Sequence, residues 1–137
     1  MSVVIDPVEF SQTLIRCPSV TPAEGGALTT LKTQLEDLGF SGHLVSFSAE
    51  DTPDVENLYA RIGTRGRNFC FAGHTDVVPV GDAGAWDDDP FAAIIRDGVL
   101  YGRGASDMKA AIAAFTAATS EFLADNPGNT LAVENLR

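Results

Sequence analysis

A short apolar run at residues 68–73 ends in a histidine and an aspartate that stand two positions apart, His74 and Asp76. A continuous apolar run of this length is typical of a strand buried within a sheet. In an extended chain, residues i and i+2 project to the same side. His74 and Asp76 are therefore expected to point the same way at the end of a buried strand, where they form either half of a metal site or an ordinary strand-end turn.

Two helices are expected before this strand. Asp6 can cap a helix and Pro7 suits its first position, so the first helix is predicted to begin there and to end before residue 17. The second is predicted to begin at residues 21–24, because leucines then recur at steps of three or four up to residue 38. Gly39 is expected to end this helix, because glycine readily adopts the left-handed backbone conformation found at helix C-termini.

The remaining elements alternate between the two kinds of structure. Strands are expected at 43–47, 57–62, 93–96, 99–101 and 130–133, a loop at 80–90 and a third helix at 108–123. In that helix Met108, Ile112, Phe115, Thr119 and Phe122 should form one face, and its many alanines should allow close packing. Together these elements predict an α/β fold, a layered mixed sheet with flanking helices. His43 is expected at the surface and Cys70 in the core.

Asp107 is expected at the start of the third helix, 33 positions after His74. In open α/β sheets, sites form where strand ends meet helix starts. His74 and Asp107 are therefore candidate zinc ligands, and the two oxygens of Asp107 could bridge two ions. Asp76 would orient the imidazole of His74. The alternative for Asp107 is a purely structural carboxylate that stabilises a helix N-terminus.

The charge of the chain excludes some partners. Nineteen acidic and nine basic residues give a net charge of −10. Such a surface repels nucleic acid and anionic lipid, so neither is an expected partner. No apolar run reaches the about 20 residues of a membrane helix, and the start of the chain lacks the features of a signal peptide. A cytoplasmic location is expected.

Two further patterns have weaker functional meaning. Gly102-Arg103-Gly104 resembles part of a nucleotide-binding loop, but Asp107 stands where that pattern needs glycine and would repel a phosphate. The acidic residues 87–89 read as a solvated loop, since they lack the other ligands of a helix-loop-helix calcium site. Neither pattern is taken as a binding site.

Residues 73–79, 86–91 and 97–109, in this order, resemble the M20 family of metallopeptidases and deacylases. The resemblance runs from about residue 6 to about residue 128. It implies a zinc-exopeptidase-like catalytic domain with two Zn²⁺ ions, for which Co²⁺ can substitute. It also implies that His74 is a zinc ligand, that Asp107 bridges the two ions, and that Asp76 is the catalytic aspartate beside them. A cis peptide bond between Asp107 and Met108 is implied as well.

The segment 14–22 resembles the deacylases of this family that remove a succinyl group from a diamino acid. The resemblance implies a small-molecule N-acyl amino acid substrate and a homodimer formed through a separate domain. Residues 1–137 are expected to be the N-terminal part of the catalytic domain, truncated, without that lid or dimerisation domain. Acetyl-group deacylases, other aminoacylases and peptidases of the family, and a non-catalytic fragment are the alternatives.

Family members also carry a pair of adjacent glutamates, one the general base and the other a metal ligand. Glu134 does not match that pair. The chain by itself is therefore expected to be inactive.

Overall fold

The computed structural model of the chain describes residues 4–66 and 68–127. Within these ranges the elements are α1 (Pro7–Ile15), α2 (Ala27–Asp37), β1 (Ser41–Ala49), β2 (Thr52–Arg61), β3 (Ile94–Arg96), β4 (Val99–Tyr101) and α3 (Ala110–Asp125). A 3-10 turn at Ala83–Ala85 lies in the predicted loop, and a π-helical turn at Ala105–Lys109 precedes α3. The strand predicted at 130–133 and Glu134 lie outside the described residues.

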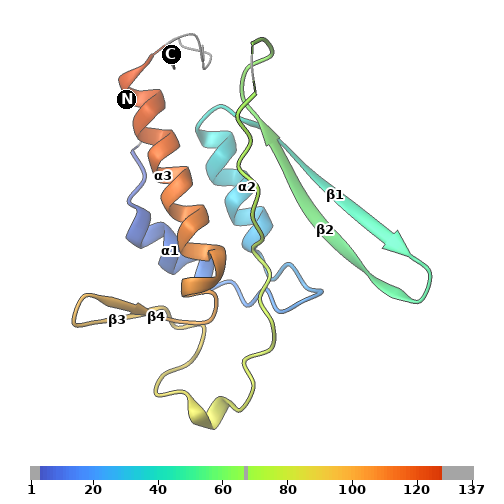
Figure 1. Ribbon diagram of the computed structural model, residues 1–137, viewed down its shortest axis with the longest axis vertical. Helices are drawn as coiled ribbons and strands as arrows, with labels where there is room; N and C mark the ends of the chain where they lie inside the picture. The colour runs from blue at the N-terminus through green and yellow to red at the C-terminus, as the bar shows by residue number, and fades with distance from the viewer. Residues whose placement is uncertain (1–3, 67, 128–137) are drawn as a thin grey trace.

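The α/β class is confirmed, and its strands form small sheets. β1 pairs with β2 and β3 pairs with β4, both antiparallel. Parallel pairing occurs at an isolated bridge between Val20 and Val77. Figure 1 shows the three helices side by side, with the β1–β2 hairpin extending away from them on the side of α2. A long extended segment between β2 and the 3-10 turn runs along the helices and carries His74 and Asp76.

Helix α1 begins where the sequence predicts. The carboxylate of Asp6 accepts hydrogen bonds from the backbone N–H groups of Val8 at 2.7 Å and Glu9 at 3.1 Å. Pro7 occupies the first helical position, where its missing N–H costs nothing. The cap and the proline are local signals, so neighbouring residues are sufficient to position this end of the helix.

Helix α2 begins at Ala27, later than predicted. Gly25 and Gly26 have positive φ angles of 57° and 87°, so the right-handed helix cannot include them. Glu24 still serves the helix start, because its carboxylate accepts hydrogen bonds from the N–H groups of Gly26 at 2.9 Å and Leu28 at 3.0 Å. Gly39, at φ 94°, confirms the predicted left-handed end.

The core lies between the helices, and α3 presents a different face to it than predicted. The buried residues of α3 are Ile112, Ala113, Thr116, Ala117 and Ser120. Phe122, from the predicted face, is 42% exposed and therefore lies outside the buried face. Small side chains let α1 approach α3 closely, whereas phenylalanines on the same face would hold the two helices apart. The Ser120 hydroxyl accepts a hydrogen bond from the Ile5 N–H at 3.0 Å.

The apolar run at 68–73 is extended but is not a strand, which corrects the prediction. Phe69 is 76% exposed and Cys70 is exposed, so the predicted burial of Cys70 is also wrong. Within the described ranges no strand pairs with this run. Its phenylalanines pack on α3 instead: the ring of Phe71 lies 4.1 Å from that of Phe115, and the ring of Phe69 lies 6.3 Å from it.

The β3–β4 hairpin confirms the signal of Asp97-Gly98. Both residues have positive φ angles, 52° and 77°, as the tight turn of a two-residue hairpin requires. The β1–β2 hairpin is longer than predicted at both strands, and His43 is exposed on β1 as expected. Among the described residues, the helices are all too short or too polar to cross a membrane.

Leu14 is fully buried in the core. Leu14→Ala should lower the free energy of unfolding by about 2–5 kcal/mol, because it removes buried surface and leaves a cavity. Val8→Ala, on the same helix but 51% exposed, should change it by less than about 0.5 kcal/mol. Urea unfolding followed by circular dichroism measures both. Equal losses would contradict the placement of this core.

Gly104 precedes the π-helical turn with φ 87°, and a Cβ there would lie 2.8 Å from Val77 Cγ1. Gly98 has a similar φ of 77° with open space around it. Gly104→Ala and Gly98→Ala should share a backbone cost of about 1–2 kcal/mol. Gly104→Ala should lose about 1–3 kcal/mol more through overpacking. Matching unfolding free energies for the two variants would argue against the contact with Val77.

Candidate metal centre

His74 lies next to Asp76, as the spacing predicts. The imidazole Nδ1 is 3.0 Å from the backbone carbonyl oxygen of Asp76 and 3.4 Å from Asp76 Oδ1. A carbonyl oxygen can only accept a hydrogen bond, so Nδ1 carries the proton in this contact. Nε2 is then the ring nitrogen whose lone pair a metal ion would bind.

Asp107 approaches the other nitrogen of the same ring. Its Oδ1 lies 3.2 Å from His74 Nε2. The β3–β4 hairpin leads into the π-helical turn that carries Asp107, so the tertiary structure joins two residues that are 33 positions apart. His74 therefore stands between two carboxylates, one at each ring nitrogen.

The chain turns sharply after Asp107, but without the cis peptide bond that the family resemblance implies. The bond between Asp107 and Met108 is trans, while Met108 adopts φ 72°. A trans bond avoids the about 3–4 kcal/mol of a non-proline cis bond, and a left-handed residue can make the turn in its place. The implied cis bond is therefore wrong for this structure.

The two facing atoms fit a shared metal ion. Zinc binds histidine nitrogen and carboxylate oxygen at about 2.0–2.2 Å, and two corners of a tetrahedron of that size lie about 3.3–3.6 Å apart. The observed separation between His74 Nε2 and Asp107 Oδ1 is 3.2 Å. A small divalent cation could thus bind both atoms with little movement of either side chain.

The described residues do not complete a coordination sphere. Within residues 4–66 and 68–127, no group of three or more His, Cys, Asp and Glu side chains is arranged to hold a metal ion. The three side chains are also open to solvent: His74 is 44% exposed, Asp76 52% and Asp107 72%. This part of the chain therefore presents an open pair of donors.

Sequence reasoning missed a group of residues that hold the site in place. Lys109 is fully buried, and its ammonium donates a hydrogen bond to the backbone carbonyl oxygen of Cys17 at 2.8 Å. Burial lowers the pKa of Lys109, while the adjacent Cys17 acts to raise it. A lysine two residues after Asp107 in an alanine-rich stretch was the available signal. Thr21, which contacts Asp76 through its hydroxyl, gave no comparable signal.

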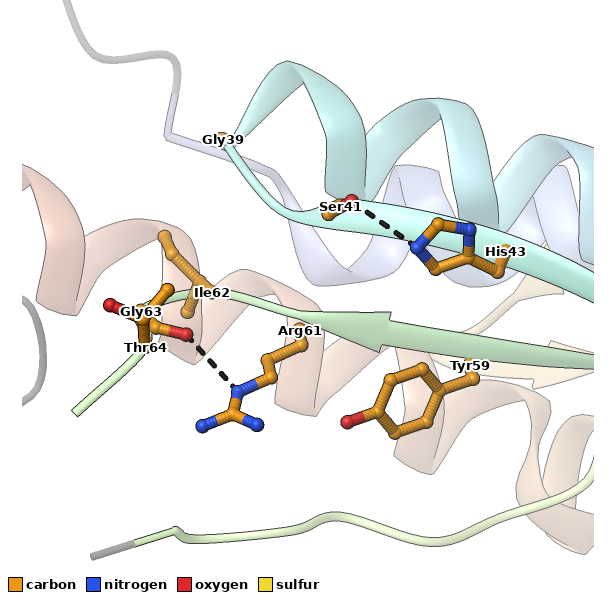
Figure 2. A pocket seen from close by; sticks show the side chains of 8 residues that line it. All are labelled: Gly39, Ser41, His43, Tyr59, Arg61, Ile62, Gly63 and Thr64. Carbon is orange, nitrogen blue, oxygen red and sulfur yellow. Dashed lines mark hydrogen bonds between the residues drawn. The ribbon is translucent and has the colours of Figure 1, made fainter. Parts of the chain in front are cut away.

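A separate open pocket of about 410 Å³ lies at the end of the β1–β2 hairpin. Figure 2 shows His43, Tyr59 and Arg61 around it, together with Ile62 and Thr64. Two of its side chains bond to near neighbours: His43 contacts the Ser41 hydroxyl at 3.4 Å, and Arg61 donates to the carbonyl oxygen of Gly63 at 3.1 Å. None of the three metal-site candidates lines this pocket.

Known proteins resemble this chain in sequence and in fold. Residues 70–133 match the model of peptidase family M20/M25/M40. Succinyl-diaminopimelate desuccinylase of Parvibaculum lavamentivorans is 65% identical over 117 residues, which cover 85% of this chain and 30% of the relative. The enzyme of the same name from Caulobacter vibrioides is 60% identical over 129 residues, 94% of this chain and 32% of the relative.

Two solved structures share the fold with a TM-score of 0.72 each. Human carnosine dipeptidase 1 is 25% identical, and the match covers 86% of this chain and 28% of that one. An M20 family metallo-carboxypeptidase from Sulfolobus solfataricus is 27% identical, with coverage of 88% and 28%. The chain thus spans about 30% of the length of the curated relatives it matches. Over that portion it resembles the peptidase M20 family and is similar in sequence to the succinyl-diaminopimelate desuccinylases.

Proposed function

We propose that this chain carries part of the metal centre of an amide hydrolase. The substrate is N-succinyl-L,L-diaminopimelate, and the products are succinate and L,L-diaminopimelate, a precursor of lysine and of the cell wall. The observation that supports this most is the 56–65% identity to enzymes named succinyl-diaminopimelate desuccinylase. The matched family segment includes His74, Asp76 and Asp107.

In this proposal each of the three side chains has a separate role. His74 offers Nε2 to a metal ion, while its Nδ1–H donates to the carbonyl oxygen of Asp76. Asp107 offers Oδ1 to the same ion and has a second oxygen for another ion. Asp76 lies beside the imidazole and would hold its orientation. The divalent ions, Zn²⁺ or Co²⁺, would supply positive charge that polarises the amide carbonyl and lowers the pKa of the attacking water.

Hydrolysis also needs a group that takes the proton of the attacking water and passes it to the leaving amine. Asp76 is poorly placed for this role, since its Oδ2 accepts a hydrogen bond from Thr21 and its Oδ1 faces His74. Asp107 is assigned to the metal. Under this proposal His74, Asp76 and Asp107 do not supply the general base. Turnover therefore depends on glutamates of the kind that the family resemblance implies.

Another deacylase or a peptidase of the same family is the rival function. The names of the solved structures, a dipeptidase and a carboxypeptidase, favour peptide bonds as substrates. Their identity to this chain is 25–27%, however, against 56–65% for the desuccinylases. The much higher identity supports the succinyl substrate over the peptide.

Isothermal titration with zinc tests the ligand pair. The chain should bind zinc weakly, because the described donors supply two corners of a sphere that needs four. Loss of a residue that only supports a metal ligand weakens metal binding by about 10- to 100-fold. His74→Ala and Asp107→Ala should each weaken zinc binding by more than this, because each removes a ligand. His43→Ala, which changes the other histidine, should have no effect. Unchanged affinity in both His74→Ala and Asp107→Ala would rule out the assignment.

Succinate release tests the dependence on further residues. With zinc and N-succinyl-L,L-diaminopimelate, the purified chain should release no succinate above background. The full-length Parvibaculum lavamentivorans relative should release it under the same conditions. Turnover by the chain itself would show that its own residues include a working base. Absence of turnover in the relative would instead count against the proposed substrate.

A further inference from the structure

Residues 17–21 belong to the connection between α1 and α2 and contact both parts of the candidate metal centre. We call these residues the anchor segment. On one side the Ser19 hydroxyl donates to the carbonyl oxygen of Thr75 at 2.7 Å, and the Val77 N–H donates to the carbonyl oxygen of Ser19 at 2.9 Å. The Thr21 N–H donates to the carbonyl oxygen of Val77 at 3.0 Å. The backbone on both sides of Asp76 is thus bonded to the anchor segment.

The side chain of Thr21 adds a contact to Asp76 itself. Its hydroxyl donates to Asp76 Oδ2 at 2.5 Å, within the range of hydrogen bonds from a hydroxyl to an ionised carboxylate. The other oxygen of the same carboxylate, Oδ1, lies 3.4 Å from His74 Nδ1. Because a carboxylate is planar, a bond that holds one oxygen also sets the direction of the other.

The anchor segment also reaches the part of the chain that carries Asp107. The buried ammonium of Lys109 donates to the carbonyl oxygen of Cys17 at 2.8 Å. Lys109 follows Asp107 by two residues, and its own N–H donates to the carbonyl oxygen of Gly104 at 3.2 Å. The same short segment therefore bonds to the Asp76 carboxylate and to the chain two residues after Asp107.

We propose that Thr21 is a positioning residue that acts through Asp76. Its hydroxyl holds the carboxylate so that Oδ1 faces Nδ1 of His74, which directs Nε2 of the ring toward Asp107. Loss of the hydroxyl frees the carboxylate to rotate and leaves the ring with the carbonyl oxygen of Asp76 as its Nδ1 partner. The effect on the imidazole does not need a metal ion; only the effect on metal affinity rests on the proposed function.

The rival explanation is a purely local role. The Thr21 hydroxyl also lies 3.4 Å from the carbonyl oxygen of Val77, so it could simply stabilise the turn. A residue with that role would change the stability of the chain but not the state of the His74 ring. The ring nitrogens of His74 are therefore the measurement that separates the two explanations.

Four variants provide the comparison. Thr21→Val keeps the shape of the side chain and removes the hydroxyl, and Thr21→Ala removes the hydroxyl with less bulk. Thr21→Ser keeps the hydroxyl. Thr33→Val is the matched control, since Thr33 is an exposed threonine on α2 whose hydroxyl bonds to the carbonyl oxygen of Thr29 at 3.0 Å. Thr21 is also exposed, so its substitution should leave the fold intact.

Long-range ¹⁵N–¹H spectra of the metal-free chain at one neutral pH report the ring nitrogens. Thr21→Val and Thr21→Ala should shift the His74 signals, Thr21→Ser should restore them, and Thr33→Val should leave them unchanged. The signals of His43, the other histidine of the chain, should stay constant in all four and show that each variant is folded. If one hydroxyl-free variant unfolds, the other decides. Unchanged His74 signals in a folded hydroxyl-free variant would overturn the proposal.

Zinc titration of the same variants connects the positioning role to the proposed function. Thr21→Val should bind zinc about 10- to 100-fold more weakly, as expected when the partner of a ligand histidine is disturbed. Thr21→Ser should bind it as the unmodified chain does. If the unmodified chain does not bind zinc but the His74 signals still shift, the positioning role stands and the metal assignment fails. Equal zinc affinity with unshifted signals would reject the positioning role alone.

Discussion

The parallel bridge between Val20 and Val77 is the interaction on which the candidate site depends most. It joins the connection between α1 and α2 to the long extended segment that carries His74 and Asp76. That segment has no strand partner among the described residues, so its backbone position rests on this bridge and on the stacking of Phe71 against α3. Backbone hydrogen bonds have fixed geometry, and they set the direction of the flanking side chains more firmly than apolar contacts do.

The buried ammonium of Lys109 complements this bridge. A lysine is rarely buried without a partner, because removing the charge from water is costly. Here the carbonyl oxygen of Cys17, two residues after the end of α1, accepts a hydrogen bond from it. The other buried polar groups are also hydrogen-bonded: within the described ranges, every buried side-chain nitrogen and oxygen has a hydrogen-bond partner.

The electrostatic character of the site follows from its position in an acidic chain. Two carboxylates flank one imidazole in a protein whose net charge is −10. All three side chains are partly exposed, so the surrounding field favours the approach of cations and opposes the approach of anions. An anionic substrate would need positive charge at the site before it could bind. Bound divalent ions would meet that need, in keeping with the chemistry proposed for this chain.

The sequence by itself determined the features that depend on neighbouring residues. These are the start of α1 at Asp6, the left-handed end of α2 at Gly39, the Asp97-Gly98 hairpin and the side-by-side placement of His74 and Asp76. Only the tertiary structure decided which face of α3 is buried, where residues 68–73 pack, and how Lys109 and Thr21 hold the site. Caps and turns need only a few adjacent residues. Burial and long-range hydrogen bonds depend on which distant surfaces meet, and local sequence patterns do not specify that.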